Sequence, residues 1–420
     1  MSEFVKTFLD QVLLEPISGS RPKGGVNTEG DIPSLGGENV TMTGSLKFYP
    51  VKKISSNFYN SMSRGHLRNL DVLINKDGAN TGKSSIYRNS PYKSAAVNEH
   101  LFILRGKEGV LEQEYLHYLL QLPSVRAIID KKITGSAQPG LNTTFIHNFP
   151  IELAPLSEQK KIVSILTSMD EVIENTQKQI DKLQDLKKAT MNELLTNGIG
   201  HKEFKDSELG RIPKSWEVKK LQELTSGKFG IVDGPFGSNL KTEHYRSSGV
   251  PVIQSGFVTS GKFIAKNYIY VDYSKFKAEI RSAVNGGDIV MAKIGAQAGK
   301  CAIMPKMHPV GILAGNSLKI SPNENVLNIN YLNNLLTHLY VTGEIQNLRT
   351  ETAQPAISIA TLKQYKIRVP NVLEQKKITD TIDSIEAGIE RRFQKLSRIQ
   401  ALKKSLMQDL LTGKVRVKAN

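Results

Sequence analysis

Glu158-Gln159-Lys160-Lys161-Ile162 recurs as Glu374-Gln375-Lys376-Lys377-Ile378, and the two copies lie 216 residues apart. Comparing 137–196 with 353–412 without a gap gives 20 identities in 60 positions. Solenoid repeats are much shorter, at about 20–50 residues. The repeat therefore indicates a duplicated domain, and a chain that performs one task twice.

Each copy carries a long segment that is predicted to be helical. Apolar residues recur there at alternating steps of four and three, which is the a/d spacing of a coiled coil. Both patterns are interrupted at the same place, by Thr176 and Arg392. The first stripe comprises Ile162, Leu166, Met169, Ile173, Ile180, Leu183 and Leu186, and the second comprises Ile378, Ile382, Ile385, Ile389, Leu396, Ile399 and Leu402.

A helix of about 40 residues is about 60 Å long, more than one small domain can cover. We therefore expect these stripes to form the core of a helix pair, and two repeats related by a pseudo-twofold axis would pack the helices antiparallel. The alternative is that each stripe packs on its own globular domain, since such stripes usually serve a core.

The remaining segments have the size of ordinary globular domains. Short apolar runs bounded by Gly, Asn and Pro, such as 71–74, 250–253 and 289–291, predict strands, and 111–129 and 331–348 predict helices. The fold class is therefore α+β, with two mixed domains that each precede a long helix. The predicted layout is domain 1–156, helix 157–197, linker 198–212, domain 213–372, helix 373–412 and tail 413–420.

The charge balance indicates a polyanionic partner. The chain has 56 Lys and Arg against 40 Asp and Glu, a net charge of +16. Charge alone does not separate nucleic acid from a membrane surface. No apolar run approaches the roughly 18 residues of a membrane span, and the first residues lack a signal-peptide pattern. The single cysteine, Cys301, excludes a disulfide within the chain, so we expect a cytoplasmic protein.

Together these features resemble the specificity (S) subunit of type I restriction–modification systems. The motifs that carry the resemblance occur twice and in the same order. Ile212-Pro213-Lys214-Ser215-Trp216 is similar to the motif that begins domains of this family, whereas Met1–Leu14 stands in its place in the first domain. The repeated motifs are Gln138-Pro139-Gly140-Leu141-Asn142 with Gln354-Pro355-Ala356-Ile357-Ser358, Leu156-Ser157-Glu158-Gln159 with Leu373-Glu374-Gln375, and Leu194-Leu195-Thr196 with Leu410-Leu411-Thr412.

The resemblance implies a non-catalytic DNA-recognition subunit. Each globular domain would be a target-recognition domain for one half of a bipartite, asymmetric DNA target. The helices would set the gap between the halves and dock two methyltransferase subunits, which two restriction–translocation subunits would join. S-adenosylmethionine, ATP and magnesium would be held by those partners, and this chain would bind no cofactor.

Two other classes of protein were weighed. A self-contained methyltransferase or nuclease is one, since Asn89-Ser90-Pro91-Tyr92 resembles a methyltransferase loop and Asp206 with Glu217 and Lys219 has nuclease-like spacing. The first lacks a glycine-rich cofactor pocket, and the second falls in a polar linker without an expected strand. Residues 78–84 resemble a phosphate loop but have three residues between the glycines instead of four. A non-specific coiled-coil scaffold is the other class, and the two differing basic domains argue against it.

DNA contacts are expected from Lys and Arg to phosphates, and from Arg, Lys, Asn and Gln to base edges. Candidates were taken from polar, glycine-bordered loops and from the turn that is repeated in both domains. In the first domain they are Lys23, Arg64, Lys76, Asn80, Lys83 and Arg88, and in the second Lys241, Arg246, Gln254, Lys293, Gln297 and Lys300. For each of these residues the alternative is a solvated surface side chain.

Overall fold

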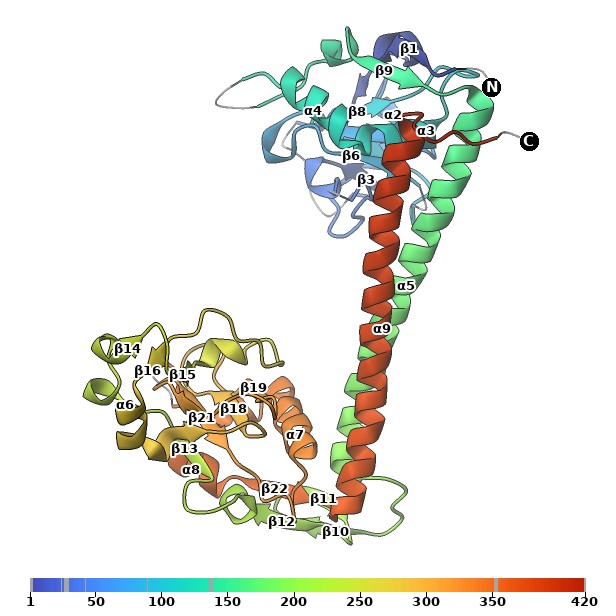
Figure 1. The fold of residues 1–420 in the computed structure, drawn as a ribbon. Coiled ribbons are helices and arrows are strands. Elements are labelled where there is room, and N and C mark those ends of the chain that lie inside the picture. The colour runs from blue at the N-terminus through green and yellow to red at the C-terminus, as the bar shows by residue number, and fades with distance from the viewer. Residues whose placement is uncertain are drawn as a thin grey trace. The chain divides into compact units, whose positions relative to one another are not determined.

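The computed structural model describes residues 3–23, 25, 30–41, 43–88, 90–135, 139–350 and 354–418. These residues form two compact units. Unit 1 comprises Met1–Lys178 with Gln394–Asn420, and unit 2 comprises Gln179–Phe393. Each unit therefore holds one globular domain, one part of the first long helix and one part of the second (Figure 1).

The globular domain of unit 1 has mixed secondary structure, with its longer helices late, as the sequence predicts. Its helices are α1 (Leu9–Val12), α2 (Ser56–Ser61), α3 (Gln113–Gln121) and α4 (Pro123–Lys132). Its strands are β1 (Val5–Phe8), β2 (Ile17–Ser18), β3 (Ile32–Leu35), β4 (Lys53–Ile54), β5 (Asp71–Asn75), β6 (Ser84–Tyr87), β7 (Ala96–Val97), β8 (Leu101–Leu104) and β9 (Pro150–Leu153). The predicted single helix over 111–129 is two helices, because Pro123 cannot continue α3 and instead begins α4.

The domain of unit 2 has the same plan with additional strands. Its helices are α6 (Tyr273–Ala278), α7 (Ile329–Thr342) and α8 (Ile359–Gln364). Its strands are β12 (Glu217–Lys220), β13 (Ile231–Asp233), β14 (Tyr245–Arg246), β15 (Val250–Ile253), β16 (Tyr270–Val271), β17 (Ala283–Val284), β18 (Ile289–Ala292), β19 (Cys301–Ile303), β20 (Gly311–Leu313), β21 (Ser317–Ile320) and β22 (Lys366–Val369).

The sheets confirm the duplication. The four-stranded sheet β2-β8-β5-β6 of unit 1 corresponds to β13-β21-β18-β19 of unit 2. The parallel pair β3–β7 corresponds to the parallel pair β15–β20, and the antiparallel pair β1–β9 corresponds to β12–β22. The central strands β5 and β18 are buried on both faces, which explains why they read as continuous apolar runs.

The two long helices are α5 (Leu156–Asn197) and α9 (Val372–Leu411). In unit 1 Lys403 forms an ion pair with Asp170 at 2.5 Å, and in unit 2 Lys187 forms an ion pair with Glu386. These two pairs exchange when 216 is added to the residue number, so the same bond is made in each unit. In unit 2, Arg392 also donates to Gln179 at 3.2 Å, and the pairs together set the antiparallel direction (Figure 1).

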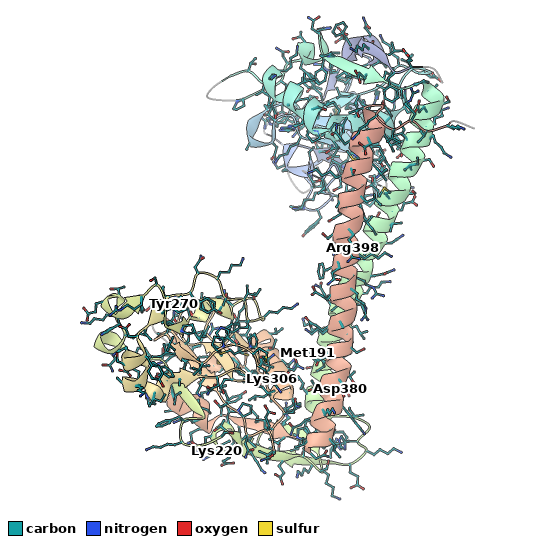
Figure 2. The ribbon with its side chains drawn as sticks, viewed as in Figure 1. Met191, Lys220, Tyr270, Lys306, Asp380 and Arg398 are labelled. Atoms are coloured by element: carbon teal, nitrogen blue, oxygen red, sulfur yellow. The ribbon has the colours of Figure 1, made fainter. Side chains whose placement is uncertain are left out.

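Burial along the predicted stripes depends on position. Ile162 and Leu166 belong to the core of the first domain, and Ile378 and Ile382 to that of the second, as the alternative interpretation expected. Met191, labelled in Figure 2, also lies in the core of unit 2. Ile180, Ile389 and Leu396 are buried as well, whereas Met169, Ile173, Leu183, Ile385 and Ile399 are half-buried.

Leu186 and Leu402 depart from the predicted core of the helix pair. They are 50% and 54% exposed, while the next residues, Lys187 and Lys403, make the ion pairs between the helices. The physical reason is that a straight helix has 3.6 residues per turn, so a strict 3.5-residue pattern drifts away from the contact line. The same departure occurs at equivalent positions in both units.

The repeated glutamine fixes each long helix to its own domain. The Gln159 side chain accepts from the Glu112 amide at 3.0 Å and donates to the Val110 and Ala154 carbonyls at 3.0 and 2.9 Å. Gln375 makes the same three bonds, to the Asn328 amide and to the carbonyls of Val326 and Pro370, at 2.7, 3.0 and 2.8 Å. Both side chains are fully buried, so each satisfies backbone groups that water cannot reach.

The repeated glutamate receives the chain that returns from the opposite helix end. In unit 2 the Glu374 carboxylate accepts from Ile199 N at 3.1 Å, His201 Nε2 at 2.6 Å and Trp216 Nε1 at 3.1 Å. In unit 1 Glu158 accepts from Arg416 Nε at 2.9 Å and from the Val417 amide at 3.1 Å. The carboxylates therefore anchor the linker in one unit and the tail in the other.

The amino-terminal segment compensates for the missing Ile-Pro-x-x-Trp motif. Val5 pairs with Leu153 and Glu217 pairs with Val369, so Phe4 takes the place of Trp216. Phe4 has no N–H to offer the glutamate. The Arg416 guanidinium lies over its ring, 4.9 Å from the centroid, and donates to Glu158 instead.

We expect Arg416→Gln to destabilise unit 1 in a pH-dependent manner. The hydrogen bonds from Arg416 hold the pKa of the Glu158 carboxyl below its ordinary value. A lowered pKa stabilises the folded state at neutral pH, and that contribution disappears as the pH falls through the lowered value. Thermal unfolding should therefore separate the variant from the parent at pH 7 and less so below about pH 4. Lys414→Gln, at a 76% exposed neighbour, is the control, and an equal pH dependence of both variants would contradict the assignment.

The linker contains more structure than the sequence analysis expected. Residues Phe204–Ser207 (β10) and Gly210–Pro213 (β11) form an antiparallel hairpin, because Leu209 and Gly210 allow a tight turn that packs on the second domain. Asp206 lies on β10 and Glu217 with Lys219 on β12, so the lack of a strand was a wrong reason to reject a nuclease site there. Among the described residues, however, no group of three or more His, Cys, Asp or Glu is placed to hold a metal.

The helices within the described ranges include none that is both long enough and apolar enough to cross a membrane.

Candidate nucleic-acid interface

The repeated turns connect the two central strands at one end of each main sheet. In unit 1 Lys76–Lys83 joins β5 to β6, and in unit 2 Lys293–Lys300 joins β18 to β19. Gly78 and Gly82 have φ of 77°, and Gly295 and Gly299 have φ of 94° and 97°. These are left-handed conformations that favour glycine, which explains the spacing of the glycines. A phosphate loop leads from a strand into a helix, whereas these turns lead from strand to strand.

The Gln-Pro segments pack against these turns. Gly78 N donates to Pro139 O at 3.2 Å, and Gly295 N donates to Pro355 O at 2.9 Å. Ala137, Gln138 and Ala353 lie outside the described residues. The same hydrogen bond therefore joins two repeated motifs that are about 60 residues apart, and this explains why both recur in the sequence.

In unit 1 the turn brings together three of the predicted contact residues. Lys83 Nζ donates to Asn80 Oδ1, and Asn80 Nδ2 donates to Gly37 O at 3.2 Å. Lys76 lies 5.4 Å from the centroid of the Phe102 ring. All three side chains are half-buried, so each keeps part of its surface in solvent.

In unit 2 the equivalent turn has a different chemistry. Gln297 is exposed at the tip, and Lys300 Nζ donates to Thr259 O at 2.9 Å. Lys293 is almost buried, forms an ion pair with Asp233 at 2.6 Å and lies 3.8 Å from the centroid of the Phe236 ring. Gln254 is half-buried at the end of β15, where the next residue's amide faces Asn316 Oδ1 at 3.4 Å.

The remaining predicted residues lie apart from the repeated turns. Lys23, Arg64 and Lys241 are exposed on loops, and Arg246 pairs with Asp272 at 2.9 Å on the edge strand β14. Arg88 follows β6, at the sheet end opposite the turn. It lies 3.6 Å from Glu114 and 3.7 Å from Asp170 of α5, so its charge already has acidic partners.

Two aromatic or charged groups at the turns were missed by the sequence analysis. Phe236 is 45% exposed beneath Lys293, and Arg281 lies 3.4 Å from Asp233. Phe236 had a usable signal, since it stands in the glycine- and proline-bordered stretch 234–237. Arg281 had none, because only the fold brings it to Asp233.

The arrangement suits recognition better than covalent chemistry. Exposed amide and ammonium groups stand on tight glycine turns, where backbone and side chain can approach a phosphate or base edge. Burial raises the pKa of the Cys301 thiol to about 12, so it is not a nucleophile at neutral pH. Burial, with Arg88 and Lys403 nearby, lowers the pKa of His117 to about 3, so its ring is neutral and enclosed.

Comparisons with known proteins agree with this plan. The family described as "Type I restriction modification DNA specificity domain" matches residues 15–185 and 213–401. The chain is 31% identical over 353 residues to the type I restriction enzyme MjaVIII specificity subunit of Methanocaldococcus jannaschii, covering 83% of this chain and 80% of that protein. It is 32% identical over 341 residues to the putative MjaX specificity subunit of the same organism, covering 80% and 76%.

A solved structure shares the fold. It describes complex assembly and conformational transition of the type I R-M system, and one of its chains has a TM-score of 0.62 to this chain. The identity is 15%, and 99% of each chain is covered.

Proposed function

The chain belongs to the specificity subunits of type I restriction–modification systems, and from this premise we propose how its two copies divide the work. Each globular domain reads one half of a bipartite, asymmetric DNA target. The long helices set the gap between the halves. The chain itself is a non-catalytic DNA-recognition subunit, which is the role that the names of its relatives give.

The observation that carries this proposal is a shared scaffold with differing tips. The two turns have the same backbone and the same hydrogen bond to a Gln-Pro segment, but they present Asn80 in one domain and Gln297 in the other. A pair of domains with one shape and two sets of polar side chains suits a DNA target with two different halves.

We assign the DNA-facing surface to the turn end of each domain. In the first domain this comprises Lys76, Asn80 and Lys83, and in the second Gln254, Gln297 and Lys300. Arg88 is left outside this surface because Glu114 and Asp170 already neutralise it. Lys293 acts by holding Phe236 and Asp233 in place, since it is almost buried between them.

Specificity subunits work with other restriction–modification subunits and with DNA. We propose that two methyltransferase subunits dock on the long helices, and that two restriction–translocation subunits complete the complex. S-adenosylmethionine, ATP and magnesium belong to those partners in this arrangement. The complex acts on DNA in the cytoplasm, methylating adenine in recognised DNA and cleaving DNA that lacks the mark.

The division of labour predicts a simple pair of results. The purified chain should transfer no labelled methyl group to DNA, whereas the chain with its methyltransferase subunit should methylate adenine at one bipartite sequence. The measurement is incorporation from labelled S-adenosylmethionine followed by sequencing of methylated sites. Methyl transfer by the chain alone would instead favour the self-contained methyltransferase.

Gln297→Ala tests the proposed DNA surface. Losing a base contact typically costs about 1–3 kcal/mol of discrimination, and at one position only. Sequencing of methylated sites should therefore show relaxed choice within one half of the target and an unchanged other half. Gln184→Ala, at an exposed helix position, is the matched control. Relaxation in both halves, or in neither, would contradict the assignment.

A further inference from the structure

The two units differ at a groove between the first strand pair and the late helices of each domain. In unit 1 the groove has a volume of about 530 Å³ and lies between β1, β9, α3, α4 and the end of α9. Leu119, Leu122, Val125 and Ile128 form its apolar wall, and Leu411 contributes from α9.

The equivalent groove of unit 2 is filled by the chain itself. It has a volume of about 110 Å³ and is lined by Leu335, Glu344, Ile367 and other residues that lie 216 positions after residues of the first groove. Leu209, from the turn of the β10–β11 hairpin, is one of its walls. The difference in volume is therefore the place that the hairpin turn takes.

Polar contacts hold that turn in unit 2. Arg368 Nη2 donates to the Leu209 carbonyl at 2.5 Å, and Lys366 forms an ion pair with Glu208. The equivalent residues of unit 1 are Glu152 and Pro150, which offer neither cation. The first groove is thus shaped for a similar turn but lacks the partners for an acidic one.

The rim of the first groove is also more apolar. The paired strands place Phe8 opposite Pro150 and Lys220 opposite Lys366, so Phe8 stands where unit 2 has Lys220 (labelled in Figure 2). By the same alignment Val5 stands where unit 2 has Glu217. Phe8 is 41% and Val5 61% exposed, although apolar side chains of this size usually gain by burial.

We propose that this groove of unit 1 is a docking site for a leucine-bearing, non-acidic turn of one methyltransferase subunit. The inference rests on the proposed function, in which these subunits dock on the long helices. The unit 2 hairpin shows what such a groove accepts, and Leu411 with Thr412 makes the groove continuous with the α9 surface. Because unit 2 closes its own groove, only one of the two methyltransferase subunits gains this contact, and the two bind unequally.

The chain supplies the variant that tests this. Phe8→Lys with Ile128→Glu gives the first groove the residues that unit 2 carries at Lys220 and Glu344, both of which that fold accommodates. Phe8→Lys alone is the second variant, for the case that the double variant unfolds. Ala127→Glu places the same charge on an exposed neighbour in α4 and is the control.

The experiment is a titration of the full chain with its purified methyltransferase subunit, in which native mass spectrometry separates 1:1 from 1:2 complexes. We expect the groove variants to weaken one binding step by about tenfold or more and to leave the other unchanged, because one apolar contact is lost. The control should change neither step. Equal weakening of both steps, or no weakening of either, overturns the inference.

Two further outcomes separate the groove from the function on which it rests. Loss of self-association of the chain, with both partner steps unchanged, would give the groove to a second copy and overturn the proposal. If the parent chain binds no methyltransferase subunit at all, the proposed function fails as well. If the parent binds two and the variants bind both as well, only the groove assignment fails.

Discussion

Gln375→Leu is expected to lower the unfolding free energy of unit 2 by about 3–6 kcal/mol. The substitution leaves the Asn328 amide and the carbonyls of Val326 and Pro370 buried without partners, and each such group costs about 1–3 kcal/mol. Urea unfolding of the full chain measures the loss as an earlier transition of one unit. Recognition of one half of the target should disappear with it.

Two matched variants sharpen this result. Gln159→Leu removes the same three bonds in unit 1, so it should shift the other transition and abolish the other half of the target. Gln400→Leu changes an exposed glutamine of the second helix that is also repeated, and its effect should stay within about 0.5 kcal/mol. An effect of Gln375→Leu as small as that of Gln400→Leu would show that the repeated glutamine does not anchor the helix.

The duplicated plan could be predicted because identity is concentrated where a repeated bond demands one residue type. Gln159 and Gln375 each meet one amide and two carbonyls, a set that a single side-chain amide satisfies. The domains drift because strands tolerate many apolar residues. The family resemblance and the helix pattern were therefore accessible from the sequence.

What the sequence did not reveal depends on partners far apart in the chain. Phe4 has no local signal as a substitute for Trp216, because the missing donor comes from Arg416 at the other end of the chain. The pairing of Lys187 and Lys403 across the helices was hidden behind the leucines that precede them. The hairpin at 204–213 was hidden by its polar composition, since only Leu209 packs inward.

The contact residues were the least predictable part. Asn80, Lys83, Gln297 and Lys300 were found because the repeated glycines marked their turns. Arg88 was chosen on charge and loop position alone, which do not show that Glu114 and Asp170 lie beside it. A surface cation and a paired one look the same in a sequence, so the fold has to separate them.

Lengthening both helices by one heptad is expected to change the gap in the DNA target and leave its two half-sequences unchanged. Duplicating Glu174–Ile180 in α5 and Glu390–Leu396 in α9 adds seven residues to each helix at equivalent positions. The pairs Asp170–Lys403 and Lys187–Glu386 then keep their partners, because each lies outside the inserted stretch. A single insertion would break the register of one of these pairs, so the matched form is the proper test.

Seven residues add about 10 Å of helix. At about 3.4 Å per base pair this amounts to at most three or so base pairs, and fewer if the helices lie obliquely to the DNA. The half-sequences should be retained, because no residue of either turn moves within its own domain. Sequencing of methylated DNA from cells that carry the variant gives both quantities at once.

The control replaces residues 174–180 and 390–396 by other heptads of the same a/d pattern, without lengthening either helix. It should methylate the parental sequence with the parental gap, which separates helix length from helix composition. A lengthened chain that keeps the parental gap and alters a half-sequence would mean that the helices do not set the spacing. Loss of methylation by the lengthened chain alone would mean that a partner bridges both helix ends at a fixed distance, and binding of the methyltransferase subunit to that variant would then be reduced at its second step.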